Sequence, residues 1–216
     1  MTIKLLIADD HGVVRDGLCA LFKPEIDITI VGCADNGRQA VKQVLKLSPD
    51  VVTMDIAMPI LNGILATEQI MKTHPDTRII ILSMHASKEY ISSSFKAGAI
   101  GYLLKESVGK EVVQAVRSVY SGIRYLGQGL SDIVFDQYVD MQTDLIHNPI
   151  DLLSSREKEI LQMVVEGKSS TQIAKILCLS SKTIDTYRSR LMRKLSLKGI
   201  PSLVKFAIRH GVTTTE

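Results

Sequence analysis

Short apolar runs alternate with amphipathic segments through the first 122 residues of the chain. Each run is four to six residues long, is rich in Ile, Val or Leu, and is bounded by Asp, Gly or Pro, which is typical of strands buried on both faces. The runs predict five strands, at Ile3–Ala8, Ile28–Cys33, Val51–Met54, Arg78–Leu82 and Ile100–Leu104. The segments beside them have apolar residues at helical spacing and predict five helices, at Val13–Phe22, Gly37–Leu47, Gly63–Thr73, Glu89–Ala97 and Lys110–Ser121.

Five strand–helix units of this length predict an α/β domain over residues 1–122. The expected fold is a doubly wound, five-stranded parallel sheet with right-handed crossovers. In such a sheet the functional crevice lies outside the carboxyl ends of the strands. Candidate chemistry is therefore expected in the loops that follow the strands.

The alternation ends after residue 122. Residues 123–150 contain four Asp and are punctuated by Gly127, Gly129, Asn148 and Pro149, a composition that favours a linker. We interpret this stretch as a linker with one helical piece around Asp132–Tyr138.

Only helices are predicted over residues 151–216. Two capping boxes, Ser154-x-x-Glu157 and Ser169-x-x-Gln172, open the first two helices. The helices are expected at Glu157–Val165, Gln172–Leu177, Lys182–Leu195 and Ser202–His210. A short turn joins the second and third, so the pattern predicts an all-α, four-helix domain of the helix-turn-helix kind.

The composition is that of an ordinary soluble protein, with 45% hydrophobic and 23% charged residues in 216. Three widely spaced cysteines without a CxxC motif argue against a disulfide framework and fit a reducing compartment. No run approaches the roughly 18 apolar residues of a membrane span, and the N-terminus does not resemble a signal peptide. We therefore expect a cytoplasmic protein without a membrane partner.

The net charge of +3 is unevenly divided. Residues 151–216 carry twelve Lys/Arg and six Asp/Glu, whereas residues 1–150 carry fourteen and seventeen. The basic second domain is expected to meet a polyanion, although a solvated basic surface would have the same composition.

Acidic residues stand at two predicted strand ends. Asp9 and Asp10 follow the first strand, and Asp55 follows the third, its neighbour in a parallel sheet. Because close carboxylates repel unless a cation or a proton joins them, we expect Mg²⁺ there. Ser83 and Lys105 end the fourth and fifth strands and add a hydroxyl and a cation. Although a single strand-end Asp is more often a helix cap, this combination suits phosphoryl transfer to Asp55 as the nucleophile.

These residues resemble the receiver domain of two-component response regulators over about residues 3–121. The motifs that carry the resemblance are Asp9-Asp10, Met54-Asp55-Ile56-x-Met58-Pro59-x-x-Asn62-Gly63, Leu82-Ser83-Met84-His85 and Lys105. The resemblance implies that a sensor histidine kinase phosphorylates Asp55. It also implies a CheY-like fold and a Mg²⁺ ion held by Asp10, Asp55 and the main-chain carbonyl of Ala57, with Asp9 beside them directly or through water.

The resemblance further assigns roles after phosphorylation. Ser83 would bond the phosphoryl group, Lys105 would pair with it, and Tyr102 would swing inward as Ser83 moves. These three residues would form the switch that reports phosphorylation to the rest of the protein.

The predicted helix at Lys182–Leu195 has one apolar and one polar, cationic face, as a recognition helix requires. Ile184, Tyr187, Leu191 and Leu195 make the apolar face. A solvated helix on an ordinary bundle is the alternative that charge alone leaves open. The candidate DNA-binding residues are Lys182, Thr183, Asp185, Thr186, Ser189, Arg190, Arg193 and Lys194. Of these, we expect Asp185, Thr186 and Ser189 to point at base edges and the cations to meet phosphates.

The second domain resembles the LuxR-type domain of NarL/FixJ-class regulators over about residues 150–212. The motifs include Leu153-Ser154-x-Arg156-Glu157, Gly167-Lys168-Ser169, Ile173-Ala174 and Leu179-Ser180-x-Lys182-Thr183-Ile184. The resemblance implies a recognition helix in the major groove and dimerisation through the last helix. Tyr187 and Asp185 depart from common members, so the operator sequence cannot be taken from relatives.

The last predicted helix has an apolar repeat that packing inside one domain covers only in part. We expect it to pair with a second copy, giving a two-fold dimer on an inverted-repeat site; packing within the domain is the alternative. The candidate dimerisation residues are Leu203, Val204, Ala207 and Ile208.

The leading prediction is a transcription regulator controlled by phosphorylation. Phosphorylation of Asp55 would shift domain contacts and dimerisation to allow sequence-specific binding of double-stranded DNA, with RNA polymerase as a further candidate partner. A phosphatase of the haloacid dehalogenase type is disfavoured, because such enzymes have a second Asp as general acid two residues after the nucleophile and this chain has Ala57 there. We therefore do not expect an enzyme that turns over substrate. A receiver that works without phosphorylation is disfavoured by the complete set of Asp10, Asp55, Ser83 and Lys105.

Overall fold

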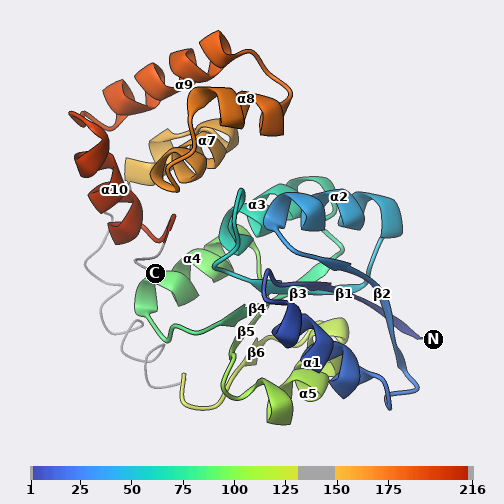
Figure 1. Cartoon of the computed structure of the whole chain (residues 1–216). Coiled ribbons are helices and arrows are strands. Elements are labelled where there is room, and N and C mark those ends of the chain that lie inside the picture. Colours follow the sequence, from blue (N-terminus) through green and yellow to red (C-terminus); the bar gives the residue numbers. More distant parts are fainter. Residues whose placement is uncertain (1, 131–148, 214–216) are drawn as a thin grey trace. The chain divides into compact units, whose positions relative to one another are not determined.

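The computed structural model describes residues 2–130 and 149–213 (Figure 1). These residues divide into two compact units, one over most of residues 2–130 and one that includes residues 149–213. The helical piece expected around Asp132–Tyr138 lies outside the described residues. No helix in the described part of the chain is long and apolar enough to cross a membrane.

The first unit is built on a parallel sheet with the strand order β2-β1-β3-β4-β5-β6. Five of the strands are those that the apolar runs predict, because a strand buried between two helical layers needs apolar residues on both faces. The strands are β1 (Ile3–Ala8), β2 (Ile28–Ala34), β3 (Val51–Asp55), β4 (Arg78–Ser83), β5 (Gly101–Leu104) and β6 (Tyr125–Leu126).

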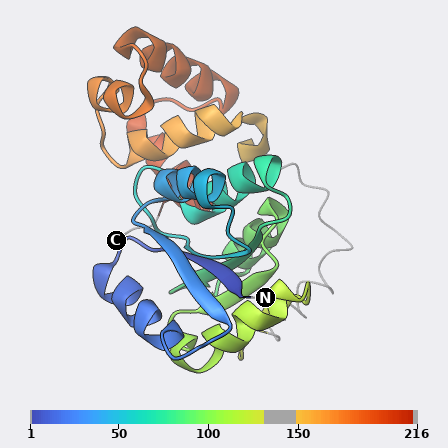
Figure 2. The same cartoon turned by 90° about the vertical axis from the view of Figure 1, so that its right-hand side faces the viewer.

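Five helices cover the two faces of this sheet. Helices α1 and α5 lie on one face and α2, α3 and α4 on the other (Figures 1 and 2). Their bounds are α1 (Gly12–Phe22), α2 (Gly37–Leu47), α3 (Gly63–Thr73), α4 (Lys88–Ala97) and α5 (Val108–Tyr120). Between α1, α5 and the sheet lies a buried core that includes Leu5, Ile7, Phe22 and Val116. The predicted doubly wound α/β fold is confirmed.

Strand β6 was not predicted, since its two residues are too few to show a periodic pattern. Tyr125 and Leu126 pair with Gly101 and Tyr102 of β5, and the Gly127 N–H donates to the Tyr102 carbonyl at 2.9 Å. The beginning of the stretch expected to be a linker therefore belongs to the sheet.

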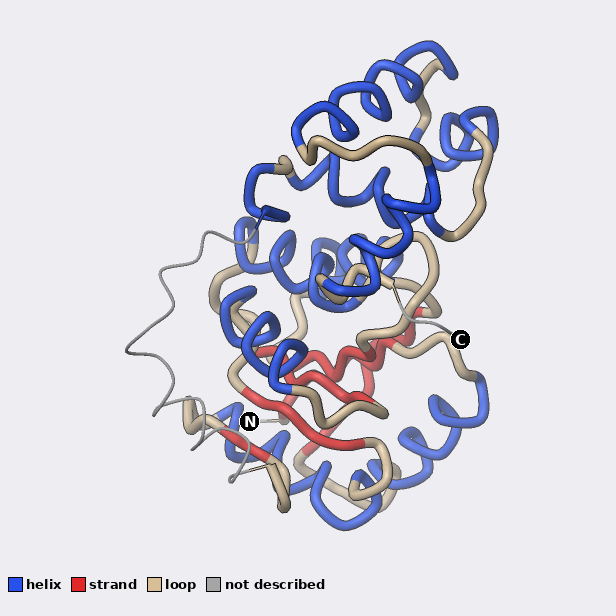
Figure 3. The backbone as a smooth tube through the Cα atoms, turned by 90° about the vertical axis from the view of Figure 1, so that its left-hand side faces the viewer, coloured by secondary structure: helices blue, strands red, loops and turns tan. Residues whose placement is uncertain are grey.

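The described residues of the second unit form helices only, and the strands, red in Figure 3, all lie in the first unit. Both predicted capping boxes are present, at Ser154 with Glu157 and at Ser169 with Gln172. The elements are the 3₁₀ turn η1 (Pro149–Leu152) and the helices α7 (Ser155–Val165), α8 (Ser170–Leu177), α9 (Ser181–Lys194) and α10 (Ile200–Arg209). The predicted all-α helix-turn-helix architecture is confirmed.

Candidate functional site

Three carboxylates meet at the carboxyl edge of the sheet. Asp55 is the last residue of β3, and Asp9 and Asp10 follow β1, which pairs with β3 up to Ala8 opposite Met54. Together with His11, these residues place one potential ligand atom each within 4.8 Å of one another. Asp9 and Asp55 are buried, whereas Asp10 is partly exposed. The convergence expected from strand order is therefore present.

Lys105 is the cation of this cluster. Its Nζ lies 2.8 Å from Asp9 Oδ2 and 3.0 Å from Asp55 Oδ2. The Lys105 N–H donates to the Ser83 carbonyl at 2.8 Å, which fixes the lysine backbone against the end of β4. Two carboxylates thus share one ammonium group, and its side chain is only 9% exposed.

His11 adds a contact that was not predicted from the sequence. Its Nδ1 lies 2.8 Å from Asp10 Oδ1, and its backbone N–H donates to Asp9 Oδ1 at 2.9 Å. The sequence feature that could have indicated this contact is the position of His11 directly after the acidic pair, where α1 begins. His11 therefore holds the two aspartates in place from the start of this helix.

The electrostatic balance leaves negative charge at the site. Burial raises the pKa of Asp55 to about 6, Lys105 opposes this shift, and Asp9 and Asp10 add to it. Burial by itself would lower the pKa of Lys105, but Asp55 and Asp9 outweigh that effect and raise it. Lys105 therefore stays charged beside carboxylates that it cannot fully neutralise.

The donor set fits a hard cation. The buried oxygens Asp9 Oδ2, Asp10 Oδ1 and Asp55 Oδ2 accept no hydrogen bond within the described residues. The Lys105 ammonium lies beside Asp9 Oδ2 and Asp55 Oδ2, and His11 Nδ1 lies beside Asp10 Oδ1. Carboxylate oxygens at one edge are ligands that Mg²⁺ accepts alongside water. Ala57 follows Asp55 by two residues, in the loop between β3 and α3.

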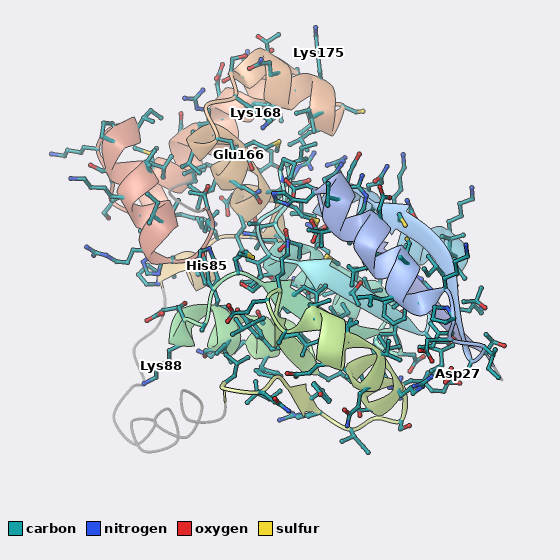
Figure 4. All side chains as sticks on the ribbon, turned by 60° about the horizontal axis from the view of Figure 1, so that its bottom comes forward. Asp27, His85, Lys88, Glu166, Lys168 and Lys175 are labelled. Carbon is teal, nitrogen blue, oxygen red and sulfur yellow. The ribbon has the colours of Figure 1, made fainter. Side chains whose placement is uncertain are left out.

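Ser83 and Tyr102 lie on the neighbouring strands. Ser83 ends β4, one residue beyond the Leu82 that pairs with Asp55, and its Oγ accepts the His85 N–H at 3.0 Å. Tyr102 is fully buried, and its hydroxyl donates to the His85 carbonyl at 2.8 Å. Burial raises the pKa of Tyr102 to about 12. The loop around His85 (labelled in Figure 4) therefore holds the Tyr102 side chain inside the protein, and its movement on phosphorylation stays a prediction.

The loop after Asp55 is shaped by a close approach at Gly63, the first residue of α3. A Cβ atom at this position would lie 1.9 Å from the Asp55 carbonyl oxygen. The Gly63 N–H donates to the Ile56 carbonyl at 3.0 Å, and the Asn62 side chain caps the helix by accepting from the Leu65 N–H at 2.8 Å. Only glycine allows the helix to begin this close to the candidate phosphoacceptor.

Helix α9 of the second unit has the two faces expected of a recognition helix. Ile184 and Leu191 are buried in the helical core, and Tyr187 is half-buried. The other face borders an open surface hollow lined by Ser180, Lys182, Thr183, Thr186, Tyr187 and Arg190. The predicted DNA-binding residues Lys182, Asp185, Thr186, Ser189, Arg190 and Arg193 are exposed, as is Lys194.

Two of these exposed residues, Lys194 and Asp185, also bond to other elements of their own domain. The Lys194 ammonium lies 2.7 Å from Glu157 Oε2 and donates to the Leu152 carbonyl at 3.1 Å. Asp185 Oδ1 accepts from the Ser170 hydroxyl at 2.6 Å, and Arg188 donates to the same hydroxyl at 2.9 Å. Lys194 therefore ties the end of α9 to the start of α7, and Asp185 ties α9 to α8.

Helix α8 contributes a cation that the sequence analysis did not include. Lys175 is exposed and points away from the helical unit (Figure 4). Lys168, just before α8, instead forms an ion pair with Glu166 at 2.5 Å. The periodicity of α9 carries no information about cations on a neighbouring helix, which explains why Lys175 was missed.

The candidate dimerisation residues of α10 divide into two groups. Leu203 and Ala207 are fully buried in the core of their own domain, and their pairing with a second copy stays a prediction. They are buried because α10 packs on α7 along this stripe. Val204 is half-buried and Ile208 is 37% exposed, and only these two lie at the surface.

Comparison with known proteins matches both units. Residues 5–117 match the response regulator receiver domain, and residues 151–207 match the LuxR family of bacterial regulatory proteins. The chain belongs to the response regulators with a LuxR-type DNA-binding domain. Members of this family are transcription regulators rather than turnover enzymes, and the phosphatase alternative is set aside.

Relatives of this response regulator match along nearly its whole length. It is 38% identical over 212 residues to the oxygen regulatory protein NreC of Staphylococcus epidermidis, covering 96% of this chain and 97% of that protein. It is 36% identical over 210 residues to the response regulator GacA of Pseudomonas syringae, covering 97% of each. A solved complex of the response regulator RcsB with DNA is 25% identical, covers 95% of this chain and 98% of that chain, and has a TM-score of 0.59.

Gly63→Ala is expected to lower the free energy of unfolding of the receiver by about 3 kcal/mol, because the new methyl group must displace the backbone at Asp55. Urea unfolding measures the change. Gly109→Ala is the matched control: nothing lies within 4 Å of its added Cβ in α5, and the change should stabilise by about 0.5–1 kcal/mol. Equal stability of the two variants would contradict the close approach.

Asp55→Asn is expected to stabilise the receiver at pH 7.5, by on the order of 2 kcal/mol. Because the pKa of Asp55 is raised from 3.8 to about 6, the folded protein binds a proton between these values that the unfolded chain releases. Wild-type stability therefore falls as pH rises through this window, and the advantage of the variant should vanish near pH 4. Urea unfolding at both pH values, with exposed Asp76→Asn as control, checks this. A variant less stable than wild type at pH 7.5 would refute it.

Proposed function

We propose that Asp55 is the phosphoacceptor of this response regulator, loaded by a sensor histidine kinase in the presence of Mg²⁺. The observation that carries the proposal is the buried pair Asp55–Lys105 beside Asp9 and Asp10. An incoming phosphoryl group adds negative charge where carboxylates already outnumber the ammonium group, so a divalent cation is needed to offset it.

Each residue would then have a defined part in phosphoryl transfer. The Asp55 carboxylate attacks phosphorus and must be ionised to do so. Asp10 and Asp55 would hold the cation together with the Ala57 carbonyl, and Asp9 would lie beside it. Lys105 is already within 3.0 Å of Asp55 Oδ2 and would pair with a phosphoryl oxygen, while the Ser83 hydroxyl at the end of β4 would bond another. Mg²⁺ supplies charge neutralisation during the transfer.

We infer that phosphorylation controls binding of the second domain to double-stranded DNA. The basic face of α9, around Lys182 and Arg190, supports DNA binding, and Lys175 of α8 is a further exposed cation of the same domain. Asp185, Thr186 and Ser189 would lie toward base edges. The proposed active form is a dimer on an inverted-repeat site, now with Val204 and Ile208 as the α10 residues that face the second copy. RNA polymerase is a further proposed partner.

The phosphoacceptor is tested by labelling the full chain with acetyl phosphate and Mg²⁺. Wild-type protein should gain one phosphoryl group by mass, Asp55→Asn none, and Asp10→Ala should need a higher Mg²⁺ concentration. The labelling rate should fall as pH falls through about 6, since protonation removes the Asp55 nucleophile; bound Mg²⁺ should move this inflection to lower pH. The exposed Asp76→Asn variant should label normally. Labelling of Asp55→Asn at the wild-type level would refute the assignment.

The two ends of α9 are expected to respond differently to loss of a lysine. Lys182→Ala should weaken binding to all DNA sequences alike and reduce the slope of log K against log salt by about one, with unchanged stability. Lys194→Ala should instead lower the unfolding free energy by about 1 kcal/mol, because it leaves the buried Glu157 carboxylate without its cation. Salt titrations of DNA binding and urea unfolding separate these outcomes. A reduced salt slope with unchanged stability in Lys194→Ala would contradict its structural role.

A further inference from the structure

Two cysteines that are far apart in the sequence lie together at the edge of the receiver sheet. Cys19 Sγ of α1 and Cys33 Sγ of β2 are 4.0 Å apart, although 14 positions separate them in the chain. Both thiols are free, Cys19 half-buried and Cys33 exposed. The third cysteine, Cys178, lies in the other domain and is also exposed. The pair takes no part in the chemistry proposed for Asp55.

A shift in strand register brings the two sulfurs together. Ile3 and Leu5 of β1 pair with Ile28 and Ile30 of β2, but Leu6 and Ile7 pair with Gly32 and Cys33. One extra residue, Val31, is therefore inserted in β2, as in a β-bulge.

The inserted residue changes the face on which Cys33 lies. Strict alternation from Ile28 and Ile30, which pack into the core under α1 and α5, would turn Cys33 to the opposite face. The insertion restores Cys33 to the face of its partner Ile7, and this is the face that α1 covers. Cys19 of α1 packs against the same core.

The surroundings of the pair allow a small molecule to reach it. An open surface hollow is lined by Cys19, Ala20, Phe22, Lys23, Ile28, Thr29 and Ile30. A disulfide requires sulfurs about 2.05 Å apart, so the two must approach by about 2 Å, which is within range of rotation about their χ1 bonds.

We propose that Cys19 and Cys33 are an oxidisable dithiol, which a hydroperoxide converts to an intramolecular disulfide between α1 and β2. In the first step the Cys19 thiol loses its proton to solvent, the thiolate attacks an oxygen of hydrogen peroxide, and the O–O bond breaks. Cys19 becomes a sulfenic acid, and the hydroxide that leaves takes up a proton from solvent to become water. In the second step the Cys33 sulfur displaces the Cys19 hydroxyl, which leaves as water with the Cys33 proton. Overall, two thiols and one hydrogen peroxide give one disulfide and two waters.

The order of the steps follows from the surroundings of Cys33. Although Cys33 is exposed as a residue, partial burial of its thiol, with a further contribution from the Cys19 sulfur, raises the pKa of Cys33 to about 11, while Arg15 opposes the shift and Asp16 adds to it. Cys33 is therefore the protonated, resolving thiol at neutral pH, and Cys19, beside the hollow, reacts first.

The disulfide would act on the receiver through α1. The Arg15 guanidinium of this helix donates to the Asp9 carbonyl at 2.7 Å, so α1 already contacts the acidic cluster at its other end. Closing a loop of about 15 residues restricts the unfolded chain, and we expect the melting temperature of the receiver to rise by about 5 °C.

The test uses the full chain carrying Cys178→Ser, which removes the third thiol and leaves the pair intact. After treatment with hydrogen peroxide, we expect neither thiol to react with a thiol reagent, the mass to fall by two hydrogen atoms, and the melting temperature to rise. Dithiothreitol should reverse all three changes. Because Glu25 lies between the two cysteines, digestion with a Glu-specific protease should yield two peptides that stay linked until reduction.

Cys19→Ser and Cys33→Ser in the same background are the matched controls. Each should melt close to the reduced parent, which shows that it folds, and neither should form the linked peptides or gain stability with peroxide. The proposal is overturned if the parent keeps both thiols under conditions that oxidise free cysteine completely. Cross-linked dimers on a non-reducing gel, or sulfinic acid at either cysteine without the linked peptides, would overturn it as well. These outcomes do not depend on labelling of Asp55.

Discussion

The receiver is organised around the burial of like charges at the end of a parallel sheet. Asp9 and Asp55 are almost inaccessible to water and share a single ammonium group, that of Lys105. Such an arrangement is costly in the resting protein, because burial and the neighbouring carboxylates raise the pKa of Asp55. The surrounding strands, which are among the most apolar segments of the chain, hold the carboxylates together despite the repulsion. The site therefore favours the binding of cations. It also favours a group that, once attached, places its negative charge farther from the aspartates.

The position of this site could be predicted from the sequence because the end of each apolar run marks the end of a strand. Asp9, Asp55, Ser83 and Lys105 each follow an apolar run, and parallel topology brings such positions to one edge. The features that sequence reasoning missed depend on contacts between distant residues or on very short elements. Strand β6 has two residues, and the partner of Lys194 is 37 positions away, at Glu157. Periodicity carries no information about either.

The apolar stripe of α10 predicts a buried side of the helix but not what covers it. An apolar stripe at helical spacing shows that a helix buries one side, but the same stripe results whether the cover is the helix's own domain or a second copy. Leu203 and Ala207 are covered from within, by the core that includes Leu161 and Ile184. The cysteine pair was missed for a related reason, since a one-residue insertion in β2 reverses which face a side chain occupies and leaves no mark in composition. The spacing of apolar residues along the chain predicts helices and strands well, but it predicts poorly which other elements they pack against.

The tie between Lys194, Glu157 and the Leu152 carbonyl limits how α9 can adapt to a ligand. Burial would raise the pKa of Glu157, but hydrogen bonds from Lys194 and Ser154 outweigh this effect and lower the pKa. The Glu157 carboxylate therefore stays ionised at neutral pH, and its contact with Lys194 is kept. The carboxyl end of α9 is therefore anchored to the beginning of its domain. Adjustment to a groove has to come from the end near Ser180, by side-chain rotation rather than by tilting the helix. Such preorganisation lowers the entropy lost on docking, and it makes the domain intolerant of sites whose spacing demands a different helix angle.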